Sequence, residues 1–343
     1  MKSMYRRTVL TLPIVFLGGF LYACSSKISP PETLAPQVAT QTMRAAASLI
    51  ARIEQPPPSA TISMPNIVTP APTITLADTP TPGFVHIDVP KEPPEHTSEL
   101  TDRSSAPIAD EKRAIGDSFD RNVFERPFTA EEMLYQGHLD IAPGAELSLA
   151  PPWVYVSIFL VDAPPADTNA IYGVELDLNL DGRGDWLITA STPLSSEWSA
   201  SGVRAHLDSN RDVGGETPAK SEISPPEGDG YESLIYDQGY GYDPDAAFAR
   251  LVTNPTVIVQ LAFKHTLIGK DKTLIWGAWA FGDEYHPDRF EYNDHLTFAE
   301  AGSPRSTSQN YPLKALAQVD STCRWIQGIL PRRNMPNLCG YSP

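Results

Sequence analysis

The sequence predicts a mainly β fold, an antiparallel β-sandwich of jelly-roll type with short helical insertions, preceded by a disordered stalk rich in proline and threonine. Two observations predict the sandwich. Apolar residues alternate with a period of two over several segments, and turn-forming residues separate these segments. One observation predicts the stalk: 11 of the 34 prolines lie in residues 55–95, among many threonines and few large apolar residues.

About eight segments have the composition of strands. They are rich in β-branched and aromatic residues, and glycine, proline, asparagine or aspartate lies between them. The predicted strands are Trp153–Val161, Ile171–Leu180, Asp185–Ala190, Gly202–Leu207, Glu232–Tyr236, Thr256–Lys264, Thr273–Phe281 and Leu296–Ala299.

Helical signals are few and short. Residues Thr129–Glu132 fit a capping box, which starts a helix. Asp243 and Pro244 are typical of a helix start, which predicts a helix over Ala246–Leu251. A further two turns are predicted over Pro312–Val319.

The N-terminus carries a targeting signal. A charged start with Lys2, Arg6 and Arg7 precedes the apolar run Val9–Leu21, and the run ends in Leu-Tyr-Ala-Cys24. This pattern resembles a bacterial lipoprotein signal peptide, with the bulky Tyr22 as a departure. The resemblance implies that residues 1–23 are removed, that Cys24 is lipidated, and that the chain is extracytoplasmic and anchored to the cell membrane or outer membrane. An uncleaved anchor and a plain secretory peptide are the alternatives.

Composition divides the remaining chain into a tether over residues 24–113 and one domain over residues 114–343. Cys323 and Cys339 are the only cysteines after Cys24, so an oxidising compartment predicts a disulfide that pins the C-terminal tail. With 42 acidic and 26 basic residues, the net charge of −16 argues against nucleic acid as a partner.

An acidic pattern marks the stretch ELDLNLDGRGDWLI, residues 175–188. Asp177, Asn179 and Asp181 recur at every second position, which matches the first half of a calcium loop. The twelfth position from Asp177 is Ile188 instead of glutamate, so the pattern predicts a calcium loop that closes on Asp185 and not an EF-hand. The alternative is a hairpin turn with a solvated acidic face.

A second stretch repeats the spacing. Asp208, Asn210 and Asp212 precede two glycines in the same way, which predicts a second Ca²⁺ ligand set. The Ca²⁺ in such loops is expected to be structural.

The segment YGVELDLNLDGRGDWLI and the later WGAWA, residues 276–280, resemble strands of the DOMON and family-nine carbohydrate-binding-module group of extracellular β-sandwiches. The domain is also similar to uncharacterised surface lipoproteins of bacteria. The resemblance implies a sandwich that binds a sugar. Some relatives bind haem, but the histidines and methionines of this domain form no convincing axial pair.

Exposed aromatic rings are the residues on which sugars stack. Trp186, Trp279, Tyr240 and Tyr242 are therefore the predicted ligand-binding residues, with burial in the core as the alternative for either tryptophan.

The sequence contains no HExxH, GxSxG, Walker or Rossmann motif. It favours a lipid-anchored cell-surface protein with a binding or structural role and a polysaccharide or cell-wall ligand. The alternatives are an extracellular hydrolase of glycans, which needs two carboxylates in a cleft, and a self-assembling subunit of a surface layer or filament.

Overall fold

The computed structural model describes residues 86–339, apart from residues 193, 214–227, 270–272, 283 and 331–337. The predicted signal peptide, Cys24 and the tether up to residue 85 lie outside the described residues. Within the described part of the chain, no helix has both the length and the apolar character needed to cross a membrane.

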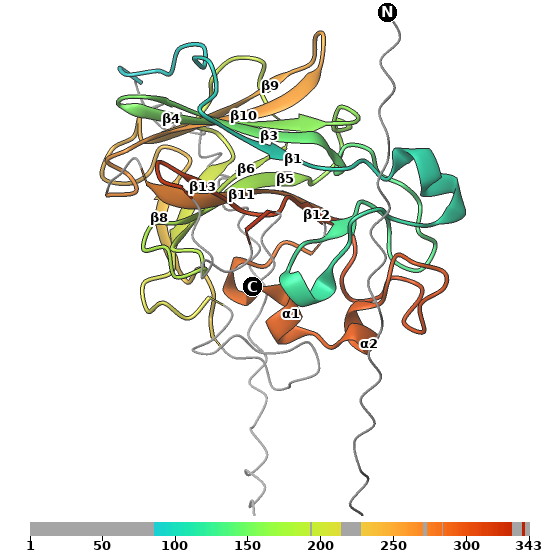
Figure 1. The fold of residues 1–343 in the computed structure, drawn as a ribbon. Helices are drawn as coiled ribbons and strands as arrows, with labels where there is room; N and C mark the ends of the chain where they lie inside the picture. Colours follow the sequence, from blue (N-terminus) through green and yellow to red (C-terminus); the bar gives the residue numbers. More distant parts are fainter. Residues whose placement is uncertain are drawn as a thin grey trace, which may run out of the picture. The chain divides into compact units, whose positions relative to one another are not determined.

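The domain consists of two antiparallel sheets, which Figure 1 shows as two layers. Five strands form the first sheet. In spatial order they are β1 (Ser98–Thr101), β3 (Ile141–Ala150), β4 (Trp153–Leu160), β10 (Val257–Lys264) and β9 (Ala247–Val252).

The second sheet is larger. In spatial order its strands are β2 (Glu125–Arg126), β12 (Val319–Ser321), β11 (Leu274–Phe281), β5 (Ile171–Asp177), β6 (Trp186–Ser191), β7 (Val203–Leu207) and β8 (Ser233–Asp237), and β13 (Trp325–Gln327) also pairs with β11. This arrangement confirms the predicted mainly β sandwich.

The main core lies between the sheets. It contains alternate residues of both layers, such as Val156 and Ile158 from β4 and Val174 and Leu176 from β5. Burying these apolar side chains stabilises the fold by about 25 cal/mol for each Å² removed from water.

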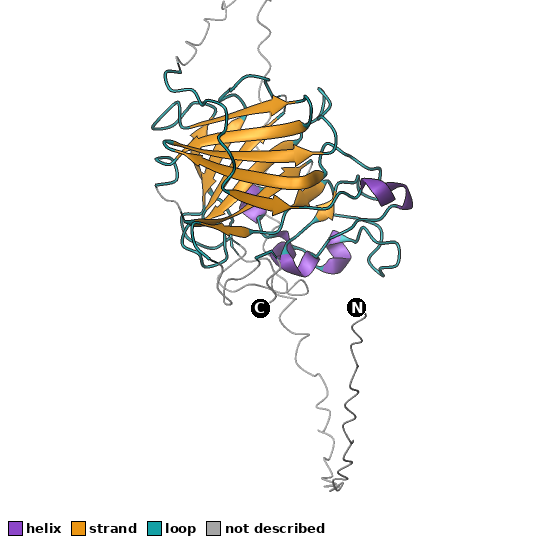
Figure 2. Ribbon diagram, turned by 45° about the horizontal axis from the view of Figure 1, so that its top comes forward, coloured by secondary structure: helices purple, strands orange, loops and turns teal. Residues whose placement is uncertain are grey.

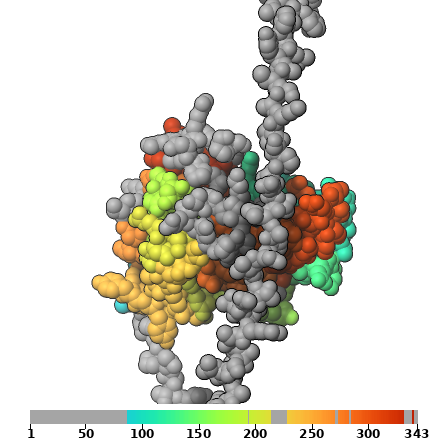
Figure 3. All heavy atoms as spheres, turned by 90° about the horizontal axis from the view of Figure 1, so that it is seen from below, coloured from blue at the N-terminus to red at the C-terminus, as the bar shows by residue number. Residues whose placement is uncertain are grey.

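The second sheet is covered on its outer face as well. Phe124, Trp279, Phe281, Phe290 and Tyr292 form a separate aromatic cluster there. Figure 3 shows the orange-red residues that follow β11 lying beside the green segment that precedes β3. Because both faces of β11 are covered, all eight of its residues are buried.

The helices are three to six residues long, and Figure 2 shows most of them beside the strand layers. They are the 3₁₀ turns η1 (Ala106–Glu111), η2 (Phe119–Arg121) and η3 (Pro287–Arg289) and the α-helices α1 (Tyr292–His295) and α2 (Phe298–Ala301).

Four local predictions are wrong. The predicted strand Leu296–Ala299 is not a strand: its second half begins α2, which Thr297 and Glu300 cap with a reciprocal capping box. The predicted helix over Ala246–Leu251 is β9, since its residues pair with the apolar strand β10. The capping-box segment Thr129–Glu132 is a turn in which Glu131 has a φ of 56°. Pro312–Val319 is likewise not helical and leads into β12.

The predicted boundary at residue 113 lies too late in the chain. Ser98–Thr101 form β1, which pairs with β3 from Ser98↔Leu147 to Thr101↔Gly144. Gly144 permits this pairing, because a Cβ at that position would overlap the carbonyl of Leu100. The ordered domain therefore includes β1, and the last part of the predicted tether belongs to the sandwich.

The predicted disulfide is present. The Sγ atoms of Cys323 and Cys339 are 1.97 Å apart, and the two residues are 16 positions apart in the sequence. Beside the bridge, Leu338 packs with Ile275 and Ile326, so the C-terminal segment is held by an apolar cluster as well.

Candidate functional site

The two acidic loops lie at the same end of the second sheet. The first joins β5 to β6 and the second follows β7, and these three strands are neighbours. The backbone N–H of Asp208 donates to the carbonyl of Asp185 at 3.0 Å, which connects the loops directly. A cavity of about 360 Å³ lies between them, lined by residues of both loops and by Trp186.

The first loop is organised by Asp177 and Asp185. Asp177 Oδ1 accepts from the N–H of Leu180 at 2.6 Å, and its Oδ2 accepts from the N–H of Gly182 at 2.8 Å. Asp185 accepts from the N–H groups of Leu178 and Asn179 and from the side-chain amide of Asn179. Burial raises the pKa of Asp177 to about 7, which these backbone donors oppose.

The second loop repeats this geometry. Asp208 Oδ1 accepts from the N–H of Arg211 at 2.5 Å, and its Oδ2 accepts from the N–H of Val213 at 2.9 Å. These donors are three and five residues after the aspartate, as in the first loop. Leu180 and Arg211, at equivalent positions, both have positive φ angles, 65° and 68°. The shared sequence spacing therefore produces two loops of the same design.

The loops offer oxygen ligands of the kind that Ca²⁺ prefers, but their carboxylates do not converge. Asp177 and Asp208 are buried and accept backbone hydrogen bonds, whereas Asp181 is exposed. Among the described residues, the one group of three or more acidic, histidine or cysteine side chains with closely spaced ligand atoms lies elsewhere.

Glu175, the first residue of the acidic stretch, is buried, so it does not lie on the solvated acidic face of the hairpin alternative. It is 1% exposed, and it accepts hydrogen bonds from the Tyr231 hydroxyl at 2.7 Å and from the Trp279 indole at 3.3 Å. The guanidinium of Arg324 lies 3.0 Å from the Glu175 carboxylate and also pairs with Glu291. Burial raises the pKa of Glu175, and the charge of Arg324 opposes this rise.

Both predicted tryptophans are buried, which corrects their assignment as a surface for ligand stacking. Trp279 is 2% exposed and stacks on Phe281 with ring centroids 5.4 Å apart. Trp186 is 7% exposed, belongs to the main core and reaches the wall of the cavity between the acidic loops. Trp279 faces the second aromatic cluster because the segments after β11 cover the outer face of the sheet.

Both predicted tyrosines are exposed. Tyr242 is fully exposed and Tyr240 is 58% exposed, after the edge strand β8. Tyr242 lines a pocket of about 540 Å³ with Ile235, Asp243 and other residues of the β8–β9 connection and the turn after β10. Asp243 is ion-paired to Lys264 at 2.9 Å, so charged and apolar groups meet at this pocket.

A second surface pocket of about 520 Å³ is more polar. Asp117 and Asp120 line it, together with Arg126 and residues of the segment 302–310. Asp117 Oδ1 lies 2.8 Å from Nε of Arg126, so this carboxylate is neutralised by an ion pair. Paired carboxylates of a hydrolase need a different arrangement, in which one acid is protonated and the other is ionised.

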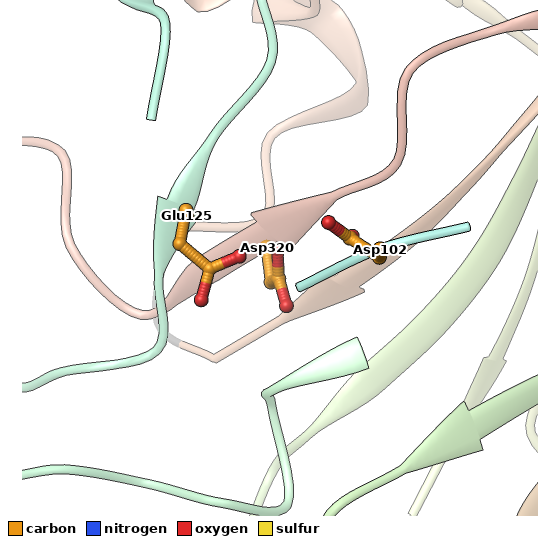
Figure 4. Close-up of side chains that lie close together, drawn as sticks. All are labelled: Asp102, Glu125 and Asp320. Atoms are coloured by element: carbon orange, nitrogen blue, oxygen red, sulfur yellow. The ribbon is translucent and has the colours of Figure 1, made fainter. Parts of the chain in front are cut away.

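Sequence reasoning missed a buried group of carboxylates. Asp102 follows β1, Glu125 lies in β2 and Asp320 lies in β12, and one oxygen from each lies within 4.8 Å of the others. Figure 4 shows the three carboxylates pointing toward one another. Their positions are separated by 23 and 195 residues, so no local spacing in the sequence connects them.

No protein-family model, curated protein or solved structure matches the chain. The resemblance of residues 172–188 and 276–280 to sugar-binding sandwiches therefore stays a prediction. The function proposed for the domain depends on its geometry.

Proposed function

We propose that this protein is a lipid-anchored binding protein of the cell surface, and that the Tyr242 pocket is its ligand site. The observation that carries the proposal is the fully exposed Tyr242, which lines a pocket of about 540 Å³, with the exposed Tyr240 two residues before it in the chain. Pockets of this size, with apolar walls and a few polar groups, are typical of ligand sites.

The chemistry of the pocket suits a carbohydrate. A tyrosine ring offers an apolar face for the C–H groups of a sugar, and its hydroxyl offers a hydrogen bond. Asp243 and Thr266 supply polar groups beside Ile235, Pro244 and Leu267. The proposed ligand is therefore a polysaccharide or a cell-wall glycan, and the site needs no catalytic group.

The location follows from the N-terminal sequence and the chemistry of the cysteines. The lipobox ending in Cys24 supports a lipid anchor, and the Cys323–Cys339 disulfide is consistent with an oxidising compartment. Residues 24–85 would then separate the anchored cysteine from the domain. Under this proposal the tyrosine pocket faces ligands outside the cytoplasm, and Ca²⁺ at the acidic loops has a structural role.

A second candidate function is self-assembly through the edge of β8. Among the described strands, β8 pairs with β7 alone, and it exposes Leu234 (50%) and Ile235 (41%). An exposed apolar edge strand is a template for pairing with another chain. This candidate predicts oligomers of the purified chain in the absence of any glycan.

The experiment that tests the binding function is a glycan array with the full chain, followed by titration calorimetry of each positive glycan. We expect Tyr242→Ala to weaken binding at least tenfold, because the ring contact is lost, with no change in melting temperature. Leu330→Ala removes an apolar side chain that is 86% exposed outside the pocket lining, and serves as the matched control. Equal affinities of wild type and Tyr242→Ala would contradict the assignment of the pocket.

Concentration-dependent oligomers that Ile235→Lys dissolves would favour the second candidate.

A further inference from the structure

The buried carboxylate cluster joins the two sheets at one end of the sandwich. Asp102 and Asp140 flank strands of the first sheet, at the end of β1 and the start of β3. Glu125 and Asp320 are direct cross-strand partners in β2 and β12 of the second sheet. Asp320 Oδ2 accepts from the N–H of Ile141 at 2.6 Å, which ties β12 to the start of β3.

Each of these four acids has one buried side-chain oxygen without a hydrogen-bond partner. These atoms are Asp102 Oδ2, Glu125 Oε1, Asp140 Oδ1 and Asp320 Oδ1. Glu125, Asp140 and Asp320 are at most 2% exposed. A buried carboxylate oxygen without a partner costs free energy, and a cation bound among these oxygens would offset that cost.

The second oxygens of Asp140, Asp102 and Asp320 accept hydrogen bonds, which hold these carboxylates in place. Asp140 Oδ2 accepts from Ser104 Oγ, from the N–H of Ser105 and from the Tyr135 hydroxyl at 2.8 Å. Asp102 Oδ1 accepts from the N–H of Arg103 at 2.8 Å. The unpartnered oxygens are therefore positioned by a built framework of donors.

The charge of these acids is not compensated by an ion pair within the part of the chain that the structure describes. Within the described residues, no arginine, lysine or histidine forms an ion pair with any of the four acids. The nearest arginine in sequence, Arg126, bonds instead to Asp117 and to the carbonyls of Ala301 and Leu316.

We propose that Asp102, Glu125 and Asp320 bind a divalent cation, Ca²⁺, with Asp140 as a fourth negative charge beside it. The donor set is all oxygen, which Ca²⁺ prefers and Zn²⁺ does not. Ca²⁺–oxygen distances of about 2.3–2.6 Å place opposite ligands up to about 5 Å apart, and the three oxygens lie within 4.8 Å of one another. The shorter distances around Mg²⁺, about 2.0–2.1 Å, need a tighter cluster.

The position of the cluster determines what the cation would do. It would bind the end of β1 to the β2–β12 pair, and so fasten a strand of the first sheet to the second sheet. Residues 103–124, between two of the ligands, carry the exposed Lys112 and Arg113. A bound cation would therefore hold the two ends of residues 103–124 together.

Titration calorimetry of the full chain, stripped with a chelator, tests the proposal with CaCl₂ alone. We expect binding with a Kd of about 1 mM or tighter, the range of extracellular calcium modules. Glu125→Gln and Asp320→Asn keep the side-chain shapes, and we expect each to weaken this binding by about 100-fold because the ligand charge is lost. Asp181→Ala, in the first acidic loop, is the matched control and should leave this binding event unchanged.

Limited proteolysis with trypsin tests the proposal on the wild-type chain, so its main result does not require any variant to fold. Ca²⁺ should slow cleavage of the wild-type chain after Lys112 and Arg113 at least tenfold. The variant Asp102→Asn, at the least buried of the three ligands, should lose this protection.

Two results would overturn the proposal. One is no heat and no protection up to about 10 mM Ca²⁺, well above the range for such modules, which would show that protons neutralise the cluster. The other is Ca²⁺ binding that Asp181→Ala abolishes and Glu125→Gln leaves intact, which would place the cation in the acidic loops.

Discussion

Arg324 Nη1 donates a 2.6 Å hydrogen bond to the carbonyl oxygen of Gly182. Arg324 follows Cys323 in the C-terminal segment, and Gly182 lies at the turn of the first acidic loop, 142 residues earlier. The same guanidinium pairs with the buried Glu175. The C-terminal segment thus supports both the backbone and the buried charge of the loop that the sequence marks as functional.

Arg324→Met should lower the free energy of unfolding by about 3–5 kcal/mol, because it leaves the Glu175 carboxylate buried without its cation. Urea unfolding followed by tryptophan fluorescence measures this change. Arg113→Met, at a half-exposed arginine, is the control and should change stability by less than about 0.5 kcal/mol. In the double variant Glu175→Gln/Arg324→Met, part of the loss should be recovered. Additive losses would contradict the buried ion pair.

The disulfide should stabilise the domain by about 3 kcal/mol, since it closes a loop of 16 residues in the unfolded chain. We expect Cys323→Ser/Cys339→Ser to lose this amount in chemical denaturation. Reducing agent should destabilise the wild type to the same extent and leave the double variant unchanged. A wild type that is insensitive to reducing agent would argue against the contribution of the bridge.

The aspartates of the first acidic loop should separate into two roles. Asp177→Ala should lower stability by about 1–3 kcal/mol even in a chelator, because two backbone N–H groups lose their acceptor. Asp181 is exposed, so Asp181→Ala should stay within about 0.5 kcal/mol of the wild type in a chelator.

If the loop binds Ca²⁺, Asp181→Ala should also remove part of the rise in melting temperature that Ca²⁺ causes. Calorimetric melts with and without Ca²⁺ measure both effects. A calcium-induced rise that is equal in Asp181→Ala and the wild type would mean that the loop is a hairpin without an ion.

His206 should make stability depend on pH below neutrality. Burial lowers the pKa of this histidine in the folded chain, and the charge of Arg204 lowers it further. The unfolded chain therefore binds a proton more readily, and stability falls as the pH drops from about 6.5 toward the lowered value. His206→Gln should flatten this part of the plot of unfolding free energy against pH. Parallel plots for variant and wild type would contradict a shifted pKa.

The strands that sequence reasoning found are those with a strong local pattern. Trp153–Val161, Thr256–Lys264 and Thr273–Phe281 correspond to β4, β10 and β11 within one or two residues. Local patterns failed where a distant partner decides the conformation. The Asp243–Pro244 helix start precedes β9, because pairing with β10 buries its apolar residues more completely than a short helix would.

The residues of the candidate site likewise fall into those that local sequence patterns predicted and those that they did not. The spacing of Asp177 with Asn179 and of Asp208 with Asn210 predicts two similar loops, because their side chains bond to backbone groups only a few residues away. The exposure of Tyr240 and Tyr242 agrees with their glycine-rich, turn-like surroundings. The burial of Trp279 was the stated alternative for that residue. The burial of Glu175 was not predicted, since Tyr231, Glu291 and Arg324, which contact its carboxylate or share its ion pair, come from distant parts of the chain.

The sequence by itself determined the alternating strands, the disulfide-forming cysteines and the repeated design of the acidic loops, because each depends on neighbours along the chain or on the only available partner. The tertiary structure alone decided which faces of the second sheet are covered, and it alone gathered Asp102, Glu125 and Asp320 from three distant strands or strand ends. The physical reason is that burial and electrostatic coupling depend on separation in space, which the packing of the two sheets sets.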